Sequence, residues 1–181
     1  MKLEFHAVVP ERWADMEALI EGRGGPHYCW CMAWRRNEFK NDMPGKAGKK
    51  ASMKRRVDDG VPIGLLGYRA GDPVAWCSVA PKTTYRPLGG KEVSDKVWSL
   101  ACFFVKREYR GRGMTQKLIA AAAEYAKDKG ACWLEAYPVA ADSPSYRFMG
   151  ICDTFAAMGF EFVETVGTRR NLMRLKLDPD A

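Results

Sequence analysis

The sequence predicts one α/β domain of the α+β type, spanning residues 1–181, around a mixed and mostly antiparallel sheet of about seven strands. The chain has 181 residues, the size of one ordinary domain. Hydrophobic residues make up 47% of it, which is enough to build a core and argues against a disordered or low-complexity protein. Strand-like and helix-like segments alternate, and hairpin patterns near both ends make a purely parallel sheet unlikely.

The first half of the chain shows strand, helix and hairpin patterns in turn. Apolar residues at helical spacing follow Pro10, and Gly71-Asp72 between two β-rich runs is typical of a hairpin turn. The predicted elements are a strand at 2–8, a helix from 10 to about 21, an irregular aromatic segment at 28–34, a helix at 47–59, and strands at 63–70 and 73–80.

The second half has the clearest helix of the chain. Its predicted buried stripe contains Leu118, Ala121, Ala122 and Tyr125, and Gly130 ends it. The predicted elements are a strand at 97–105, this helix at 113–129, a strand at 132–137, a short helix at 151–158, and strands at 160–166 and 170–177.

The formal charge of +7 is concentrated in one stretch. Residues 35–56 hold nine basic and two acidic side chains, so this stretch carries the whole net charge. A solvated helix face is the preferred interpretation, and attraction of an anionic cofactor or an acidic acceptor comes second. Nucleic-acid binding comes third, because aromatic residues are nearly absent after Phe39.

The expected location is the cytoplasm. The N-terminal residues lack the long apolar run of a secretory signal, and no stretch has the roughly 20 apolar residues of a membrane span. In that compartment the six cysteines are expected to be reduced, and single cysteines in apolar runs behave as small core residues.

The most informative motif is a buried strand, a basic turn with two glycines and a helix start, over residues 103–115. Glycines let the backbone approach a ligand closely, and free N–H groups at a helix start bind anions. Arg110 and Arg112 add charge suited to phosphate oxygens. The motif predicts a pyrophosphate site, but Gln116 replaces the third glycine of the dinucleotide fingerprint.

The chain resembles the GNAT superfamily of acyl-CoA-dependent N-acetyltransferases. The resemblance rests on residues 105–113 of this motif (VKREYRGRG) and, downstream, on Met158-Gly159-Phe160. The resemblance implies helices on both faces of the sheet and acetyl-CoA held between the strands at 97–105 and 132–137. It implies direct acetyl transfer to a primary amine, here of a small-molecule acceptor, and a possible homodimer, with no membrane partner. The cofactor-binding residues it implies are Phe103, Phe104, Val105, Arg110, Gly111, Arg112, Gly113, Met114 and Thr115.

Glu135 is the candidate general base. On the predicted central strand it shares one face with the aromatic residues Trp133 and Tyr137, and burial there would suit it to accept a proton. The alternative is a structural carboxylate paired with an arginine or lysine across the sheet.

Tyr146 is the candidate general acid. The family often has a tyrosine four residues before the Gly-Phe pair, but this chain has Phe155 there. Ser145 and Cys152 are further candidates, and the thiolate of CoA could also leave without a proton donor. Because of Phe155, a non-catalytic acyl-CoA-binding module is the first rival function. A nucleic-acid-binding protein is the second, because of the basic stretch at 35–56.

The segment at 26–35 is rich in aromatic residues and cysteine. His27, Cys29 and Cys31 have a spacing that could suit metal ligands, but a second ligand pair is missing, so we expect no metal. Trp30, Met32 and Trp34 fit either the wall of an apolar acceptor pocket or an ordinary core.

Overall fold

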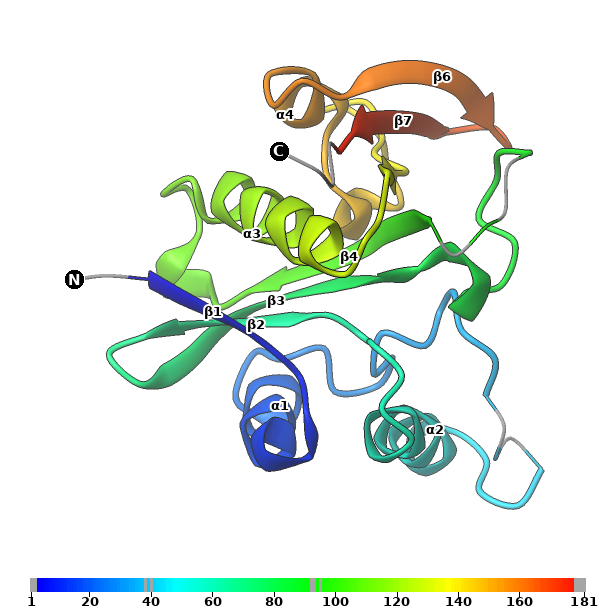
Figure 1. Ribbon diagram of the computed structural model, residues 1–181. Coiled ribbons are helices and arrows are strands. Elements are labelled where there is room, and N and C mark those ends of the chain that lie inside the picture. Colours follow the sequence, from blue (N-terminus) through cyan, green and yellow to red (C-terminus); the bar gives the residue numbers. More distant parts are fainter. Residues whose placement is uncertain (1–2, 38, 40, 92–93, 95, 178–181) are drawn as a thin grey trace.

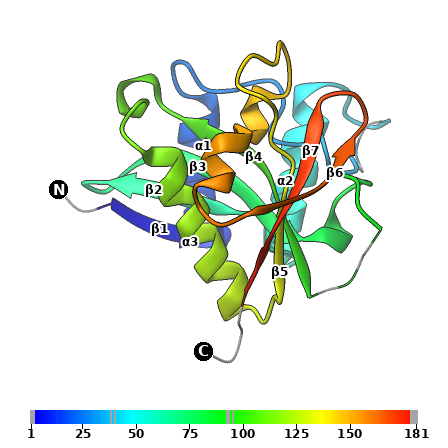
Figure 2. The ribbon, with the colours of Figure 1, turned by 90° about the horizontal axis from the view of Figure 1, so that it is seen from above.

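The computed structural model describes residues 3–37, 39, 41–91, 94 and 96–177. Seven strands in this part form one sheet in the order β1-β2-β3-β4-β5-β7-β6 (Figures 1 and 2). Residue 2 of the predicted first strand and residues 38 and 40 of the basic stretch lie outside it. The strands are β1 (Leu3–Ala7), β2 (Leu65–Arg69), β3 (Asp72–Pro81), β4 (Val97–Val105), β5 (Trp133–Ala136), β6 (Glu161–Val166) and β7 (Arg170–Lys176). The α-helices are α1 (Trp13–Glu21), α2 (Lys46–Asp58), α3 (Met114–Asp128) and α4 (Cys152–Ala156).

The sheet confirms the predicted mixed, mostly antiparallel class. Strands β4 and β5 pair in parallel, whereas the other neighbouring strands among the described residues pair antiparallel. None of the helices in the described part of the chain is long and apolar enough to span a membrane.

The hairpin between β2 and β3 turns one residue earlier than the sequence predicted. Ala70 and Gly71 both have positive φ, 54° and 85°, while Asp72 already pairs with Arg69 in the ladder. A two-residue turn whose twist matches the strands needs positive φ at both central positions, and Ala70 takes one of them despite its side chain. The predicted turn at Gly71-Asp72 is therefore wrong by one position.

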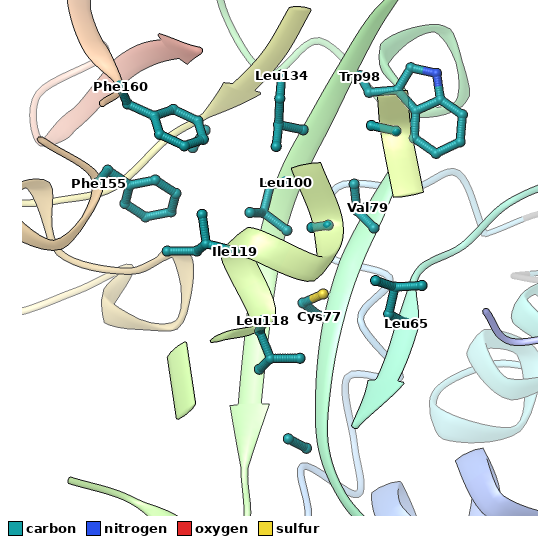
Figure 3. Packing of buried hydrophobic residues seen from close by; sticks show 14 of the residues in the cluster. Leu65, Cys77, Val79, Trp98, Leu100, Leu118, Ile119, Leu134, Phe155 and Phe160 are labelled. Carbon is teal, nitrogen blue, oxygen red and sulfur yellow. The ribbon is translucent and has the colours of Figure 1, made fainter. Parts of the chain in front are cut away.

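Helices cover both faces of the sheet (Figures 1 and 2). On one face α1 and α2 enclose an apolar cluster that includes Met16, Ile20 and Met53. On the other face α3 packs on the sheet through fully buried residues, and Figure 3 shows Leu118 and Ile119 among the core side chains. The buried stripe is rotated from the predicted one: Ile119 and Ala126 are fully buried, whereas Ala121 and Tyr125 are only partly buried.

The centre of the sheet opens between β4 and β5. Their pairing ends at Leu100 and Ala136, while β4 continues to Val105 against β3. Ala101 is an extra residue opposite β3, a bulge that bends β4. Beyond β5 the chain turns away to Val139, which bridges to Ile151 and Arg170. Among the described residues, no strand therefore pairs with the β5-side edge of β4 over residues 101–105.

Candidate active site

The glycine turn after β4 presents free backbone donors at the start of α3. Gly111 and Gly113 have φ of 69° and 70°, a conformation that favours glycine, and Gly113 is the N-cap of α3 with no side-chain cap. The first N–H groups of a helix have no partner within it and attract anions. Arg110 donates from Nε to the Val105 carbonyl oxygen at 2.8 Å, which fixes the turn to the end of β4.

A cavity of about 620 Å³ lies along this turn, and we call it the glycine-turn cavity. Of the nine predicted cofactor-binding residues it brings together eight: Phe103, Phe104, Val105, Arg110, Gly111, Gly113, Met114 and Thr115. Arg112, the ninth, is exposed and does not line it. The opposite wall holds Arg147, Phe148, Gly150 and Thr154. These residues were not predicted from the sequence, because an irregular loop carries most of them and no motif marks them.

A second cavity of about 410 Å³, the apolar cavity, continues from the first. Both cavities are lined by Phe103, Phe104, Arg110 and Phe148, so they meet where β4 leaves β5. The remaining lining residues come from the 26–35 segment, β3, β4 and the loop after β3: Pro26, Cys29, Cys31, Ala33, Trp34, Arg35, Ser78, Tyr85, Ala101 and Cys102.

The aromatic segment supplies both a pocket wall and core residues. Trp34 lines the apolar cavity, while Trp30 and Met32 are buried in the cluster beneath α1. Trp30 and Cys31 have positive φ, 47° and 52°, and these turns direct neighbouring side chains to different surroundings. Trp30 and Met32 are therefore core residues and Trp34 lines a cavity, while the role of that cavity in binding an acceptor stays a prediction.

The two thiols of this segment are not fully exposed: Cys31 is buried and Cys29 is partly buried. Cys31 Sγ lies 3.6 Å from Cys102 Sγ and accepts a hydrogen bond from Trp76 Nε1 at 3.0 Å. The Cys102 thiol and burial raise the pKa of Cys31 well above its usual value, which disfavours the thiolate that a metal requires. In the part of the chain that the structure describes, no three His, Cys, Asp or Glu residues are grouped to hold a metal ion.

Glu135 is fully buried and in contact with two cations. Its carboxylate lies 2.7 Å from Lys82 Nζ and 2.5 Å from Arg174 Nη2, and it accepts a hydrogen bond from the Tyr137 hydroxyl at 2.9 Å. These contacts match the alternative of a carboxylate paired across the sheet. Glu135 lines neither cavity, and its strand partner Ser99 precedes Phe103 by four residues, about 13 Å along the strand. Its role as a base stays a prediction.

Tyr146, the candidate acid, lies beside the apolar cavity. It is 38% exposed, and its ring centroid is 6.4 Å from that of Trp34 and 6.2 Å from that of Phe148, both of which line the cavity. The Arg170 guanidinium lies 5.8 Å from the Tyr146 ring. The fold therefore places Tyr146 beside two residues that line the apolar cavity, while its role as an acid stays a prediction.

Phe155 is part of the core beneath the glycine-turn cavity. It is fully buried, and its ring centroid lies 5.0 Å from that of Phe160 and 6.1 Å from that of Phe103. Figure 3 shows Phe155 next to Phe160. A Cβ atom on Gly150 would lie 2.6 Å from the Phe155 ring. The ring therefore supports the cavity floor at a position where the family often has a tyrosine.

A third cavity, the basic cleft, opens on the other side of the apolar cavity and measures about 1220 Å³. Arg35, Arg36, Lys49 and Arg86 are among its lining residues, and no described acidic residue lines it. Elsewhere the basic stretch packs against acidic partners on α1, as in the ion pair of Lys46 with Glu21 at 2.9 Å. The stretch is thus part cleft wall and part paired helix surface.

Solved structures share this fold at low sequence identity. The PaiA N-acetyltransferase of Thermoplasma acidophilum, solved with coenzyme A, is 14% identical with a TM-score of 0.60, covering 97% of this chain and 99% of that one. YncA of Salmonella typhimurium, solved with acetyl-CoA, is 17% identical with a TM-score of 0.59, covering 99% and 98%. An uncharacterised Bacillus halodurans protein is 16% identical with a TM-score of 0.62, covering 96% and 83%.

No curated protein sequence matches the chain. At the identities given above, the solved structures support the fold alone. The family model described as "Acetyltransferase (GNAT) family" matches residues 13–150, which is most of the chain and includes the splayed strands and the glycine turn. The chain therefore belongs to the acetyltransferase (GNAT) family, whose members are acyl-transferring enzymes.

Proposed function

We propose that this protein is an N-acetyltransferase that moves an acetyl group from acetyl-CoA to a primary amine of a small-molecule acceptor. The observation that carries the proposal is the β5-side edge of β4 over residues 101–105, which leads directly into the glycine turn. Two structures with the same fold are described with coenzyme A or acetyl-CoA, which supports the choice of cofactor.

The proposed cofactor position follows from the backbone. Backbone groups of Phe103 and Val105 pair with the amides of the pantetheine arm, as a neighbouring strand would. The N–H groups of residues 111–116 and the side chain of Arg110 hold the pyrophosphate. The thioester then lies near Phe103, where the glycine-turn cavity meets the apolar cavity.

The proposed reaction is a direct transfer. The acceptor nitrogen attacks the thioester carbonyl carbon, the C–N bond forms, and the C–S bond breaks to release the thiolate of CoA. A backbone N–H on the edge of β4 stabilises the negative charge on the carbonyl oxygen. Tyr146 donates a proton to the thiolate, and Glu135 receives the proton of the amine through intervening groups.

Two glycines of the same backbone type allow a matched test of the cofactor site. Gly113, at the turn, and Gly130, after the end of α3, both have positive φ, 70° and 80°, and neither would bring a Cβ into close contact. Alanine at each position therefore costs a similar backbone strain, on the order of 1 kcal/mol. Only Gly113 lines the glycine-turn cavity.

We expect wild-type protein to release CoA thiol from acetyl-CoA in the presence of an accepted amine. Gly113→Ala should raise the KM for acetyl-CoA, while Gly130→Ala should leave it unchanged. Equal effects of the two substitutions would show that the turn is only structural. Binding of acetyl-CoA without turnover on any amine would favour the non-catalytic module.

The roles of the two catalytic candidates are tested separately. If Glu135 is the base, Glu135→Gln lowers kcat while the protein remains folded. Full turnover of this variant at every pH would overturn the assignment.

The proposed compartment is the cytoplasm, because six cysteines without a disulfide among them fit a reducing environment.

A further inference from the structure

Arg35 is a buried cation without a carboxylate partner. The residue is 2% exposed, and among the described residues no acidic side chain forms an ion pair with it. Its guanidinium donates to neutral oxygens: Ser78 Oγ at 2.6 Å, the Tyr85 hydroxyl at 2.9 Å and the Ile63 carbonyl at 3.0 Å. A buried charge held only by neutral groups is unusual, because the protein must offset the cost of removing it from water.

The cluster of Arg35, Ser78 and Tyr85, called the Arg35 cluster below, has more donors than acceptors. Arg35 Nε has no hydrogen-bond partner in the described part of the structure. The hydroxyl oxygens of Ser78 and Tyr85 are 3.0 Å apart, so one hydroxyl donates to the other while both accept from Arg35. One hydroxyl proton remains without an acceptor among the described residues. Burial raises the pKa of Tyr85, so its hydroxyl stays protonated.

The cluster forms one end of a cavity that is otherwise mostly apolar. All three residues line the apolar cavity, whose other walls are aromatic rings, small apolar side chains, thiols and, at the junction with the glycine-turn cavity, Arg110. Ser78 pairs with Cys102 across the sheet, the residue just before Phe103 on β4. The cationic end therefore lies one strand spacing, about 5 Å, from the edge where the thioester is proposed to lie.

The surroundings reinforce the positive charge. Arg35 and Tyr85 also line the basic cleft, together with Arg36, Lys49 and Arg86, and no described acidic residue lines either cavity. An anionic group in the apolar cavity would therefore meet positive potential from both sides.

We propose that the Arg35 cluster binds a carboxylate of the acceptor, so that the substrate class is a primary amine bearing a carboxylate on an apolar body. This inference rests on the proposed function. Two donors without partners, Arg35 Nε and one hydroxyl, match the two oxygens of a carboxylate. The apolar walls accept the body of the substrate, and its amine faces the junction with the glycine-turn cavity.

Binding of simple carboxylates tests the cluster without knowledge of the natural acceptor. The probes are phenylacetate and 4-phenylbutyrate, each compared with its neutral amide by calorimetry. We expect each acid to bind at least about tenfold more tightly than its amide, since a hydrogen bond to a charged group contributes about 1.5–3 kcal/mol. Equal affinity of acid and amide, or no measurable binding of either acid, would overturn the proposal.

Three substitutions locate the binding. Arg35→Met should remove the preference for the acid. Ser78→Ala and Tyr85→Phe keep the cation, and each should weaken acid binding severalfold. These two variants provide the test if Arg35→Met does not fold. Arg36→Met removes a charge at an exposed residue that lines the basic cleft but not the apolar cavity; it is the control and should weaken acid binding far less than Arg35→Met does. Unchanged binding in both hydroxyl variants would place the carboxylate elsewhere.

Activity on matched amines then links the site to the reaction. Phenylalanine and phenethylamine share an apolar body and an amine, but only the first has a carboxylate, and Arg35→Met should reduce any preference for it. Binding of acetyl-CoA is measured on the same samples. If the acids bind but acetyl-CoA does not, the proposed function fails while the carboxylate site stands; the reverse result rejects the site and keeps the proposed function.

Discussion

Replacing Glu135 by glutamine removes the charge from a carboxylate that lies between two cations in the centre of the sheet. Glu135 is 0% exposed and the Lys82 side chain only 5%, with 2.7 Å between the charged atoms. Arg174, on the other side, is more accessible at 20%. The substitution therefore acts mainly by leaving the Lys82 ammonium buried without its counter-charge.

The expected cost follows from this burial. Removal of one partner from a buried ion pair costs about 3–5 kcal/mol, and glutamine retains some hydrogen bonding, so we expect a loss of about 3 kcal/mol in the free energy of unfolding. With an unfolding entropy of about 2.1 cal/mol/K per residue, a chain of 181 residues would lose about 8 °C in Tm. Lys82→Met should cost less, because Glu135 keeps Arg174 and Tyr137.

The assay is urea unfolding followed by tryptophan fluorescence, with a double-mutant cycle over Glu135→Gln and Lys82→Met. The double variant should lose less than the sum of the two single variants, because it leaves no unbalanced charge on Lys82. Glu164→Gln, on the exposed face of β6, is the control and should stay within about 0.5 kcal/mol of wild type. Glu135→Gln at wild-type stability, or strictly additive losses, would refute the reasoning.

Three other outcomes are expected. Tyr146→Phe should lower kcat by about a hundredfold or more, with acetyl-CoA affinity unchanged, because it removes the proposed proton donor; an unchanged kcat would mean that the thiolate leaves unassisted. Phe155→Tyr should lower the free energy of unfolding by about 1–3 kcal/mol in urea titrations, since it adds a hydroxyl to a fully buried ring; unchanged stability would mean that the hydroxyl finds a partner in the cavity. Burial raises the pKa of Cys77 to about 12 and also shields the thiol, so at pH 8.5 iodoacetamide should label Cys77 much more slowly in native protein than in urea; equal labelling rates, measured by mass spectrometry, would contradict this.

The elements and the glycine turn could be predicted because their signals are local. The strand at 97–105 has its predicted bounds, and the helix predicted at 113–129 begins and ends within one residue of α3. Strand, turn and helix start are adjacent in the chain, so a short motif determines where their backbone groups point. For the same reason eight of the nine predicted cofactor-binding residues line one cavity.

The contacts that decide the chemistry were not predictable in the same way. Arg35 meets Ser78 and Tyr85, which are 43 and 50 residues away, through a turn segment with positive φ that no periodicity indicates. Glu135 meets Arg174 because β7 inserts between β5 and β6, an order that local sequence does not specify. The sequence indicated that a buried Glu135 needs a cationic partner, but the order of the strands determines that Arg174 is one.

Hydrogen exchange with and without acetyl-CoA tests the central claim most directly, because it reports on the backbone that is proposed to bind the cofactor. Acetyl-CoA should protect amides in residues 101–105 and 111–116, at the splayed edge of β4 and the start of α3, and should leave the basic helix α2 unchanged. Protection of α2 with no change at the glycine turn, or no protection anywhere at saturating acetyl-CoA, would contradict the account.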